Sequence, residues 1–515
     1  MELRTRNIHM DCVRVKASSQ ITIEDDVNIP DSKPDVESIL LTCGNIIVED
    51  TKALTNQVSV RGKLDFSMLY VSEEEDRSPA GMTGTIPMNE LINLDQVSAG
   101  DNLVTDVKIE DLTIIMINSR KISVRCLAMI TVRADCMTDI RIPIAVEGGE
   151  STECHMVNHD YRETVVMKKD LIRVKDLITL PKNDPNIGCI LWQEANVTWI
   201  DYRCQNDAIR IQGELDEFLL YRSDDDDHSL HFYENTYSFN QTLECSGVRE
   251  GMIPVIDHRG AGTQVTMEKD EDGENRCVAI DIPMELDIRV YEENGYPVLE
   301  DIYAVDRRID TVTVEKEYRC VRSRNVVKQR MAERIQLAEE NPAILQLLRC
   351  RGEITIDNTA VTPEGIEVHG NIAICILYLG GEEEGGYHVR KQDLPVDYVI
   401  DLPNLPNDSC YTVEPSVEQI SAIPADSRQV DVKLILSFRT TVYRKEKVCL
   451  IESLNVDEKT DVADDLPGMA LYVVKPGDTL WKIGKRYYVS IESLKENNQL
   501  TDDVIQPGMK LLVVR

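Results

Sequence analysis

The stretch VSVRGKLDFSMLY at residues 58–70 recurs twice in the same chain, as IRIQGELDEFLLY at 209–221 and IEVHGNIAICILY at 366–378. Each version alternates apolar and polar positions before a central glycine and is rich in branched and aromatic residues, which is typical of a β-strand. A glycine inside such a run indicates a bulge or a close approach of a neighbouring backbone, because it has no Cβ. A ligand contact at this glycine is the alternative.

These strands belong to longer repeats, which we call copies one, two and three. In each copy a proline stands 28 positions before the glycine and a tyrosine 8 positions after it, and an arginine further on opens a second apolar run. The residues are Pro34, Gly62, Tyr70 and Arg120; Pro185, Gly213, Tyr221 and Arg276; Pro342, Gly370, Tyr378 and Arg428. The glycines are 151 and 157 residues apart, whereas solenoid repeats are roughly 20–50 residues long. Each copy is therefore predicted to be a domain with its own core, joined to the next like beads on a string.

The segment around each repeat proline carries a helical signal. Proline is tolerated in the first turn of a helix, so PDVESIL, PNIGCIL and PAILQLL can each begin a short one. The longer run VVKQRMAERIQLAEENPAILQLL at 326–348 favours a helix in copy three. The predicted fold class is therefore multidomain and mainly β, with three related strand-rich domains that each carry a small helical piece. The expected boundaries are 1–150, 151–310 and 311–452, followed by an acidic linker at 453–470 and a tail at 471–515.

Length and composition restrict the classes of function. A chain of 515 residues suggests roughly three to five domains, and 42% hydrophobic with 29% charged residues fits a soluble globular protein. A net charge of −35 repels nucleic acid and anionic membranes, so no nucleic-acid partner is expected. The first 20 residues lack the apolar core of a signal peptide, and no apolar run approaches the ~18 residues of a membrane span. We expect a cytoplasmic protein, with Cys126 and Cys375 as reduced core thiols inside apolar runs.

Motifs for catalysis do not occur. The phosphate-binding, dinucleotide-binding, zinc-protease and nucleophile-elbow signatures are missing, so we predict no enzyme, no catalytic residue and no cofactor. The segment CHMVNH places Cys154, His155 and His159 close together and would suit zinc on a helix, but a loop between copies is the favoured interpretation. The acidic segment SDDDDHSLHF at 223–232 lacks the spacing of a calcium loop and is predicted to be a solvated turn. No metal site is expected.

The tail contains LYVVKPGDTLWKIGKRYYVSIESLKENNQL at residues 471–500. A short strand at 472–474 leads into a Pro-Gly turn, after which Asp478 is the expected N-cap of a helix of about nine residues. Leu480, Ile483 and Tyr487 form the inward stripe of this helix. Ser490 is the expected cap of a second short helix, and IQPGMKLLVV supplies the closing strand. The order predicts a small α+β unit, strand-helix-helix-strand.

The sequence from Leu471 to Val514 strongly resembles the LysM domain. Two departures stand out: Gly484 where the family usually has alanine, and Tyr488 where glycine is common. The resemblance implies a shallow groove for glycans that contain N-acetylglucosamine, between two loops. Carried onto this chain, the walls of the groove are Gly477, Asp478, Thr479 and Leu480 on one side and Ile505, Gln506, Pro507 and Gly508 on the other.

Three acidic copies followed by a LysM domain resemble the SipL family of spore-coat morphogenesis proteins. The resemblance implies a non-catalytic adaptor in the spore coat, on the mother-cell side of the forespore surface. Its LysM domain would bind stage IV sporulation protein A, the ATPase that polymerises into the basement layer of the coat, and other coat proteins would be further partners. The tail carries a charge of +2, which leaves −37 for the preceding 470 residues and favours a separate partner for the tail.

Five residues beside the groove are candidates for the protein interface, since aromatic and amphipathic cationic side chains concentrate at interface hot spots. They are Trp481, Lys482, Ile483, Lys485 and Tyr488. Trp481 is predicted to be exposed, whereas core packing is the stronger interpretation of Ile483. The main alternative function is binding of peptidoglycan of the cortex or cell wall. An enzyme built from the copies is a third class, which titratable side chains converging in a pocket of one copy would favour.

Overall fold

The computed structural model describes residues 1–74, 77–98, 101–148, 151–226, 228–381, 386–406, 409–457 and 467–515. Copy one contains β1 (Glu2–Asn28), β2 (Val36–Leu54), β3 (Gln57–Ser72), β4 (Pro79–Asn93), β5 (Asn102–Asn118) and β6 (Lys121–Glu147). Copy two contains β7 (Thr152–Thr179), β8 (Ile187–Gln205), β9 (Ala208–Ser223), β10 (Leu230–Glu244), β11 (Ile253–Gly260), β12 (Gln264–Lys269) and β13 (Asn275–Ala304). Copy three contains β14 (Arg308–Gln336), β15 (Ile344–Val361), β16 (Gly365–Gly380), β17 (Tyr387–Asp401), β18 (Cys410–Asp426) and β19 (Gln429–Asp457). The predicted mainly-β class is confirmed.

Each copy is a sandwich of two antiparallel sheets. In copy one, the meander β2-β3-β4 faces the sheet β1-β6-β5. In copy two, the meander is β8-β9-β10, and the facing sheet is built on β13, which pairs with β7, β11 and β12. In copy three, the two sheets are β15-β16-β17 and β14-β19-β18. Inward-facing side chains of both sheets fill one apolar core per copy. Alternating burial along β3, from Val58 to Phe66, matches the period of two that the sequence indicates.

The repeated glycine lies against a neighbouring strand. A Cβ at Gly62 would strike the carbonyl oxygen of Ile47, and one at Gly370 would strike that of Thr355. A register shift lies directly beside Gly62, between Val48 and Asp50 in β2, and directly beside Gly370 in β15, whereas in β8 the shift lies one residue pair away from Gly213. The glycine therefore admits the bulged backbone of the next strand, as predicted from its place in an apolar run.

The repeated arginine fastens the turn that contains the repeated proline. Arg120 donates to the carbonyl oxygens of Ile29 and Lys33 at 3.0 and 2.8 Å, and Arg428 donates to the carbonyl oxygen of Asn341 at 2.8 Å. Arg276 binds the corresponding turn of copy two through Asn186 Oδ1 at 2.8 Å. The spacing of proline and arginine therefore reflects one local structure made three times.

The predicted helical pieces are wrong. Residues 326–336 form the end of β14 and residues 344–348 the start of β15, and β14 pairs with β19 along its length. The inward side chains Val327, Met331 and Ile335 are four residues apart, a spacing that fits a strand of period two as well as a helix. Pairing with β19 decides between the two, because tertiary context overrides intrinsic helix propensity.

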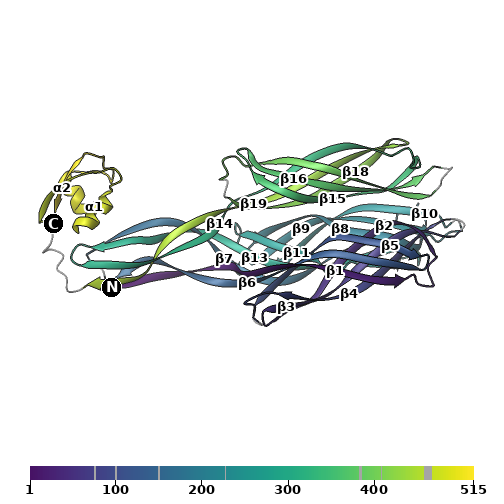
Figure 1. Ribbon diagram of the computed structural model, residues 1–515, viewed down its shortest axis with the longest axis horizontal. Coiled ribbons are helices and arrows are strands. Elements are labelled where there is room, and N and C mark those ends of the chain that lie inside the picture. The colour runs from purple at the N-terminus through teal and green to yellow at the C-terminus, as the bar shows by residue number, and fades with distance from the viewer. Residues whose placement is uncertain are drawn as a thin grey trace.

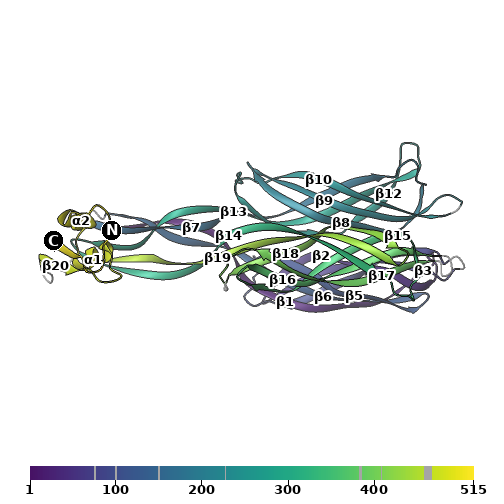
Figure 2. The ribbon, with the colours of Figure 1, turned by 90° about the horizontal axis from the view of Figure 1, so that it is seen from above.

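The beads-on-a-string arrangement is also wrong, because the copies share cores. Leu69, Leu220 and Leu377, which precede the three repeated tyrosines, meet in one buried cluster with residues of all three meanders. The six longest strands continue out of this body as a stalk (Figures 1 and 2). The stalk has its own core, which again takes residues from every copy, among them Ile142 and Tyr161. The copies form one body with a common extension.

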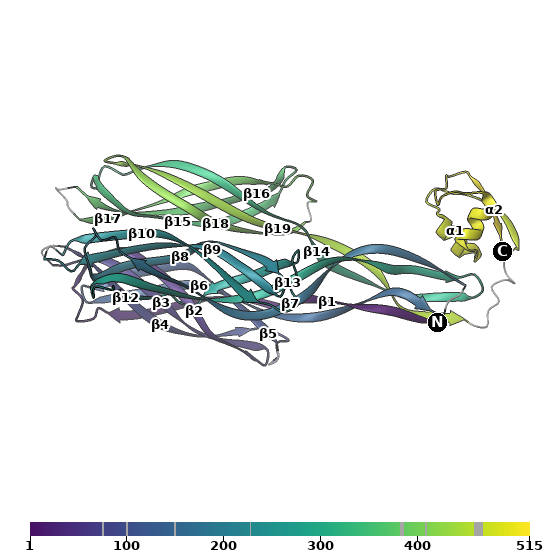
Figure 3. The ribbon, with the colours of Figure 1, turned by 180° about the vertical axis from the view of Figure 1, so that it is seen from behind.

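The tail folds as a separate unit at the end of the stalk, near the N-terminus (Figure 3). It consists of β20 (Met469–Val473), α1 (Leu480–Tyr487), α2 (Ile491–Asn498) and β21 (Lys510–Val514), and β20 pairs antiparallel with β21. Leu480 and Ile483 lie in its own core with Tyr487 packed against them, as the predicted stripe requires, and Leu494 of α2 joins them. β19 extends to Asp457 and β20 begins at Met469; of the segment expected as a linker, residues 458–466 lie outside the described residues.

The predicted cap of α1 is wrong by one residue. Thr479 is the N-cap, since its hydroxyl accepts from Lys482 N at 3.2 Å. Asp478 instead accepts from Lys475 N and from the Tyr472 hydroxyl, both at 2.7 Å, and so closes the Pro-Gly turn. The donation from Lys475 N is the main cause that lowers the pKa of Asp478. Ser490 caps α2 through Ser493 N at 3.1 Å, as predicted.

Candidate functional site

The two predicted walls of the LysM groove lie side by side. Gly508 N donates to the carbonyl oxygen of Val474 at 2.8 Å, and Val474 N donates to that of Met509 at 2.9 Å. These bonds bring the second loop against the turn that begins at Lys475. Gly477, Thr479, Gln506, Pro507 and Gly508 are exposed, Asp478 and Ile505 are half-buried, and Leu480 is a core residue. Lys482 is exposed, and its Nζ donates to the carbonyl oxygen of Gly477 at 2.9 Å.

The prediction that Trp481 is exposed is wrong, because the indole is half-buried against the end of copy two. Its Nε1 donates to Asp301 Oδ2 at 2.9 Å. The indole lies 5.0 Å from the ring of Tyr303, in an edge-to-face arrangement, and 5.1 Å from the ring of His155. We call His155, Asp301 and Tyr303 the copy-two tip, and Trp481, Gly484 and Lys485 the Trp481 face.

Lys485 binds the other oxygen of the same carboxylate. Its Nζ contacts Asp301 Oδ1, with the lysine side chain 41% and the aspartate side chain 29% exposed. Because both are partly hydrated, solvent weakens their attraction. Indole and ammonium together hold one carboxylate at both oxygens.

Gly484 provides the seat for Tyr303. The tyrosine hydroxyl donates to the carbonyl oxygen of Val489 at 2.8 Å, and its side chain is buried. A Cβ on Gly484 would lie 3.3 Å from Tyr303 Cζ and closer still to the hydroxyl. Burial also raises the pKa of Tyr303, so the hydroxyl stays protonated and remains a donor. The departure from the usual alanine is thus what lets the tyrosine reach the helix.

Tyr488 adopts the left-handed conformation, with φ 53° and ψ 47°, at the end of α1. This conformation favours glycine, which explains why glycine is common at this position in the family. Tyr488, the second departure, therefore adopts a strained backbone conformation. Tyr488 also lines a cavity of about 550 Å³ between the LysM domain and Val305 of copy two. Ile483, in contrast, is only 2% exposed and packs in the LysM core.

The histidine cluster lies on a strand instead of the predicted loop. CHMVNH is part of β7, and Glu300 stands at a register shift in the facing strand β13. His159 Nε2 lies 2.7 Å from Glu300 Oε1, while His155 faces Trp481. No group of three or more metal-binding side chains occurs among the described residues. In the acidic segment, β9 ends at Ser223 and β10 begins at Leu230, with a turn between them; Asp227 lies outside the described residues.

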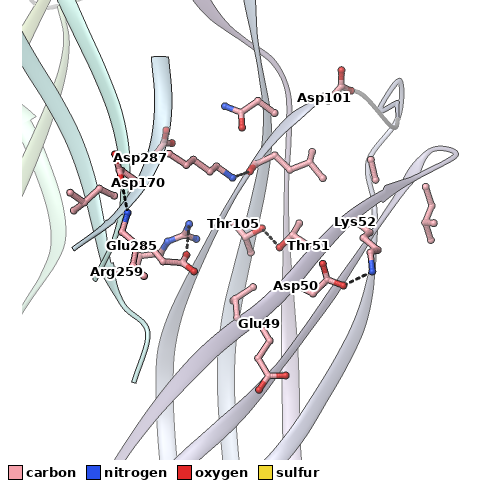
Figure 4. Close-up of a pocket in the computed structure, with 18 residues that line it drawn as sticks. Glu49, Asp50, Thr51, Lys52, Asp101, Thr105, Asp170, Arg259, Glu285 and Asp287 are labelled. Atoms are coloured by element: carbon pink, nitrogen blue, oxygen red, sulfur yellow. Dashed lines mark hydrogen bonds and ion pairs between the residues drawn. The ribbon is translucent and has the colours of Figure 1, made fainter. Parts of the chain in front are cut away.

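A polar cavity of about 800 Å³ lies between copies one and two (Figure 4). Its charged side chains are largely paired, for example Asp50 with Lys52 at 2.8 Å and Arg259 with Glu285 at 3.6 Å. Lys169 Nζ donates to the carbonyl oxygen of Leu103 across the seam, and burial lowers the pKa of this lysine. The residues of this cavity come from two copies and join them.

Sequence reasoning did not find the copy-two tip. A signal was available in the comparison of the copies. Asp301 follows a bulge that recurs in β6 and β19, and the equivalent residues there are Ala145 and Ser453. Tyr303 likewise corresponds to Glu147 and Asn455. Only copy two carries a carboxylate followed by an aromatic residue at this place.

Two family models match the chain. The SipL, SPOCS domain matches residues 35–117, 186–268 and 343–424, and the LysM domain matches residues 472–514. Each SPOCS match begins directly after the repeated proline. Within the described residues, no helix is long and apolar enough to cross a membrane.

Curated relatives match over 47 to 49 residues, about the length of the LysM domain. Spore coat assembly protein ExsA of Bacillus cereus is 51% identical over 9% of this chain and 7% of its own length. SpoIVD-associated factor A of Bacillus subtilis (strain 168) is 47% identical over 9% and 12%, and probable autolysin SsaALP of Staphylococcus aureus (strain NCTC 8325 / PS 47) is 37% identical over 10% and 18%. The chain thus covers less than a fifth of these relatives, and no solved structure matches it. By its domains, the chain belongs to the SipL-type proteins, with three SPOCS domains followed by one LysM domain.

Proposed function

We propose that this protein is a non-catalytic adaptor in assembly of the spore coat. Its LysM domain binds stage IV sporulation protein A at the forespore surface, within the mother cell. The observation that carries this proposal is the LysM domain itself, a unit with its own core at the far end of the stalk from the body (Figure 1). A head so placed can engage one partner while the body engages another. The names of two relatives, a spore coat assembly protein and a SpoIVD-associated factor, support the coat assignment.

The three copies serve as the scaffold of this adaptor. We propose that they divide close to the expected boundaries 1–150, 151–310 and 311–452, since the strand pairs β1–β6, β7–β13 and β14–β19 each close one copy. The third pair begins at Arg308 and ends at Asp457, so copy three extends a few residues beyond the expected bounds on both sides. Shared cores in the body and stalk hold the copies together. The strongly acidic composition favours basic surfaces on other coat proteins as further partners.

The second candidate function is binding of N-acetylglucosamine-containing glycan. The exposed walls of the groove favour it: Gly477, Gln506, Pro507 and Gly508 are exposed, and a Cβ on either glycine would meet no other atom within 4 Å. The autolysin name of one relative fits the same function. The two candidates use different parts of the domain: the groove for glycan, and the neighbouring Trp481 face for protein.

A co-sedimentation experiment separates the two functions. The full chain and a chain that lacks residues 469–515 are mixed with purified stage IV sporulation protein A polymers, and separately with insoluble peptidoglycan. The adaptor function predicts that only the full chain sediments with the polymers. Retention on peptidoglycan with no binding to the polymers would replace the adaptor function by the glycan function. Equal sedimentation of both chains with the polymers would mean that the LysM domain is not the binding head.

A further inference from the structure

The contact between the Trp481 face and the copy-two tip has the form of a recognition site with its ligand. A single carboxylate, that of Asp301, receives a hydrogen bond from Trp481 at one oxygen and the ammonium of Lys485 at the other. Charge-assisted donors that converge on both oxygens of one carboxylate are stronger and more directional than neutral ones. The Trp481 face therefore binds carboxylates.

The second element of recognition is an aromatic ring two residues further on. The Tyr303 ring stands edge-on to Trp481, and its hydroxyl bonds to the carbonyl oxygen of Val489. Gly484 leaves room for this ring, which an alanine would take. The site thus accepts a carboxylate and an aromatic side chain that project from the same face of one strand.

The position of the LysM domain on one of three similar strand ends supports specific recognition. The stalk offers three equivalent strand ends, each next to a bulge. Ala145 and Ser453 replace Asp301 in the other copies and cannot accept in the same way. Of these three ends, the LysM domain lies on the one that carries a carboxylate at the position directly after the bulge.

We propose that the Trp481 face is a carboxylate-binding surface and that Asp301 with Tyr303 occupies it as an internal ligand, which an external protein partner displaces with an acidic and an aromatic side chain of its own. The identity of that partner rests on the proposed function, but occupation of the face by the tip does not. The contact is suited to displacement because Lys485 and Asp301 are partly exposed to water. We call the protein with the tip on the Trp481 face the docked state. In this state the face is closed to partners, so the apparent affinity for a partner equals the intrinsic affinity multiplied by the fraction of undocked molecules.

The docked state is tested first without a partner. The chain contains three tryptophans, so the full protein labelled with 5-fluorotryptophan gives three ¹⁹F resonances, and Trp481→Phe assigns one of them. We expect Asp301→Ala to move the Trp481 resonance toward that of a solvent-exposed indole and to leave the other two unchanged. The matched control is Asp310→Ala: Asp310 lies near the start of β14, is 60% exposed and pairs with Arg308. An unchanged Trp481 resonance in Asp301→Ala would overturn the proposal.

A second variant tests the same contact from the LysM side. Gly484→Ala places a methyl group against Tyr303. It should move the Trp481 resonance in the same direction as Asp301→Ala, while far-ultraviolet circular dichroism stays that of the wild type. If Trp481 in Gly484→Ala keeps its wild-type resonance in a folded protein, the seat for Tyr303 does not exist as described.

Competition is tested with purified stage IV sporulation protein A. Asp301→Ala should bind it at least about threefold more tightly than the wild type, because the internal ligand is gone. Unchanged affinity, with the resonance moved, would overturn displacement by the partner. If neither protein binds while the resonance moves, the proposed function fails and the internal ligand stands.

Discussion

Arg349 on β15 donates from Nε to Glu194 Oε2 on β8 at 2.9 Å, and the two side chains are only 8% and 5% exposed. This ion pair joins copy three to copy two in the centre of the body. Glu194 also accepts from Trp192 Nε1 at 2.9 Å and from Arg351 at 3.3 Å, and Arg351 reaches the carbonyl oxygen of Thr42 in copy one. One buried carboxylate thus connects side chains that meet all three copies.

Removing the arginine should destabilise the whole body. Arg349→Met leaves the buried carboxylate of Glu194 with only Arg351 as a cationic partner. This loss should lower the free energy of unfolding by about 3–5 kcal/mol. Urea denaturation followed by circular dichroism measures this loss. Arg334→Met is the matched control, because Arg334 is 60% exposed in its pair with Asp431 and should leave the free energy of unfolding close to the wild-type value. Equal effects of the two substitutions would show that the central pair does not hold the copies together.

Glu217 should make stability depend on pH. It is fully buried in copy two, at the place where copies one and three have Phe66 and Ile374. Burial raises its pKa to about 7, with Asp176 adding to the shift and the hydrogen bond from Asn235 opposing it. The folded state therefore keeps a proton that the unfolded state loses near pH 4.5, so stability falls as pH rises from about 4.5 to 7 and is level above that.

The test of this pH dependence compares the wild type with Glu217→Gln. The neutral amide keeps the acceptor for Asn235 and cannot ionise, so it removes the part of the slope that Glu217 contributes, on the order of 3 kcal/mol over the interval. Urea denaturation at pH 5 and pH 8 gives the difference for each protein. Identical pH dependence in both would mean that Glu217 titrates normally.

The repeated glycine should resist substitution in a way that an ordinary strand glycine does not. Gly370→Ala drives a Cβ into the backbone of Thr355 and should cost about 1–3 kcal/mol in the free energy of unfolding. For Gly352→Ala in the same sheet, the nearest atoms are side-chain methyl groups, those of Ile374 and Ile420 at 3.2 Å and of Ile372 at 3.4 Å, and these can move. The midpoint temperature of thermal unfolding should therefore be clearly lower for Gly370→Ala than for Gly352→Ala. The reverse order would contradict the close backbone approach.

Much of the local structure could be predicted from the sequence. The alternation around Gly62 predicts its strand, the internal repeats predict three similar units, and Ser490 is recognisable as a cap because a hydroxyl before an apolar run satisfies free N–H groups. The inward stripe of Leu480 and Ile483 follows from helical spacing. These features depend on neighbours in the sequence.

The joint packing of the copies depends on contacts between distant segments, and was missed. A signal was present at the end of each repeated strand, where ICILY in copy three is apolar on both faces. Ile376 and Tyr378 point into the sandwich, while Cys375 and Leu377 point into the cluster between copies. A continuous apolar run indicates a strand that is covered on both faces. Nothing in the sequence of the tail indicates the partner of Trp481, because that partner, Asp301, lies in copy two.

The central claim is that the LysM domain binds a protein through the Trp481 face. The most direct measurement is the dissociation constant of the full chain for stage IV sporulation protein A, compared with those of Trp481→Ala and Gln506→Arg. The second variant places a bulky charged side chain on the exposed wall of the groove. We predict that Trp481→Ala weakens binding at least about tenfold, as loss of a tryptophan hot spot does, while its circular dichroism spectrum stays that of the wild type and Gln506→Arg binds normally. Weakened binding in Gln506→Arg, with wild-type binding in Trp481→Ala, would contradict the claim and assign the interaction to the groove.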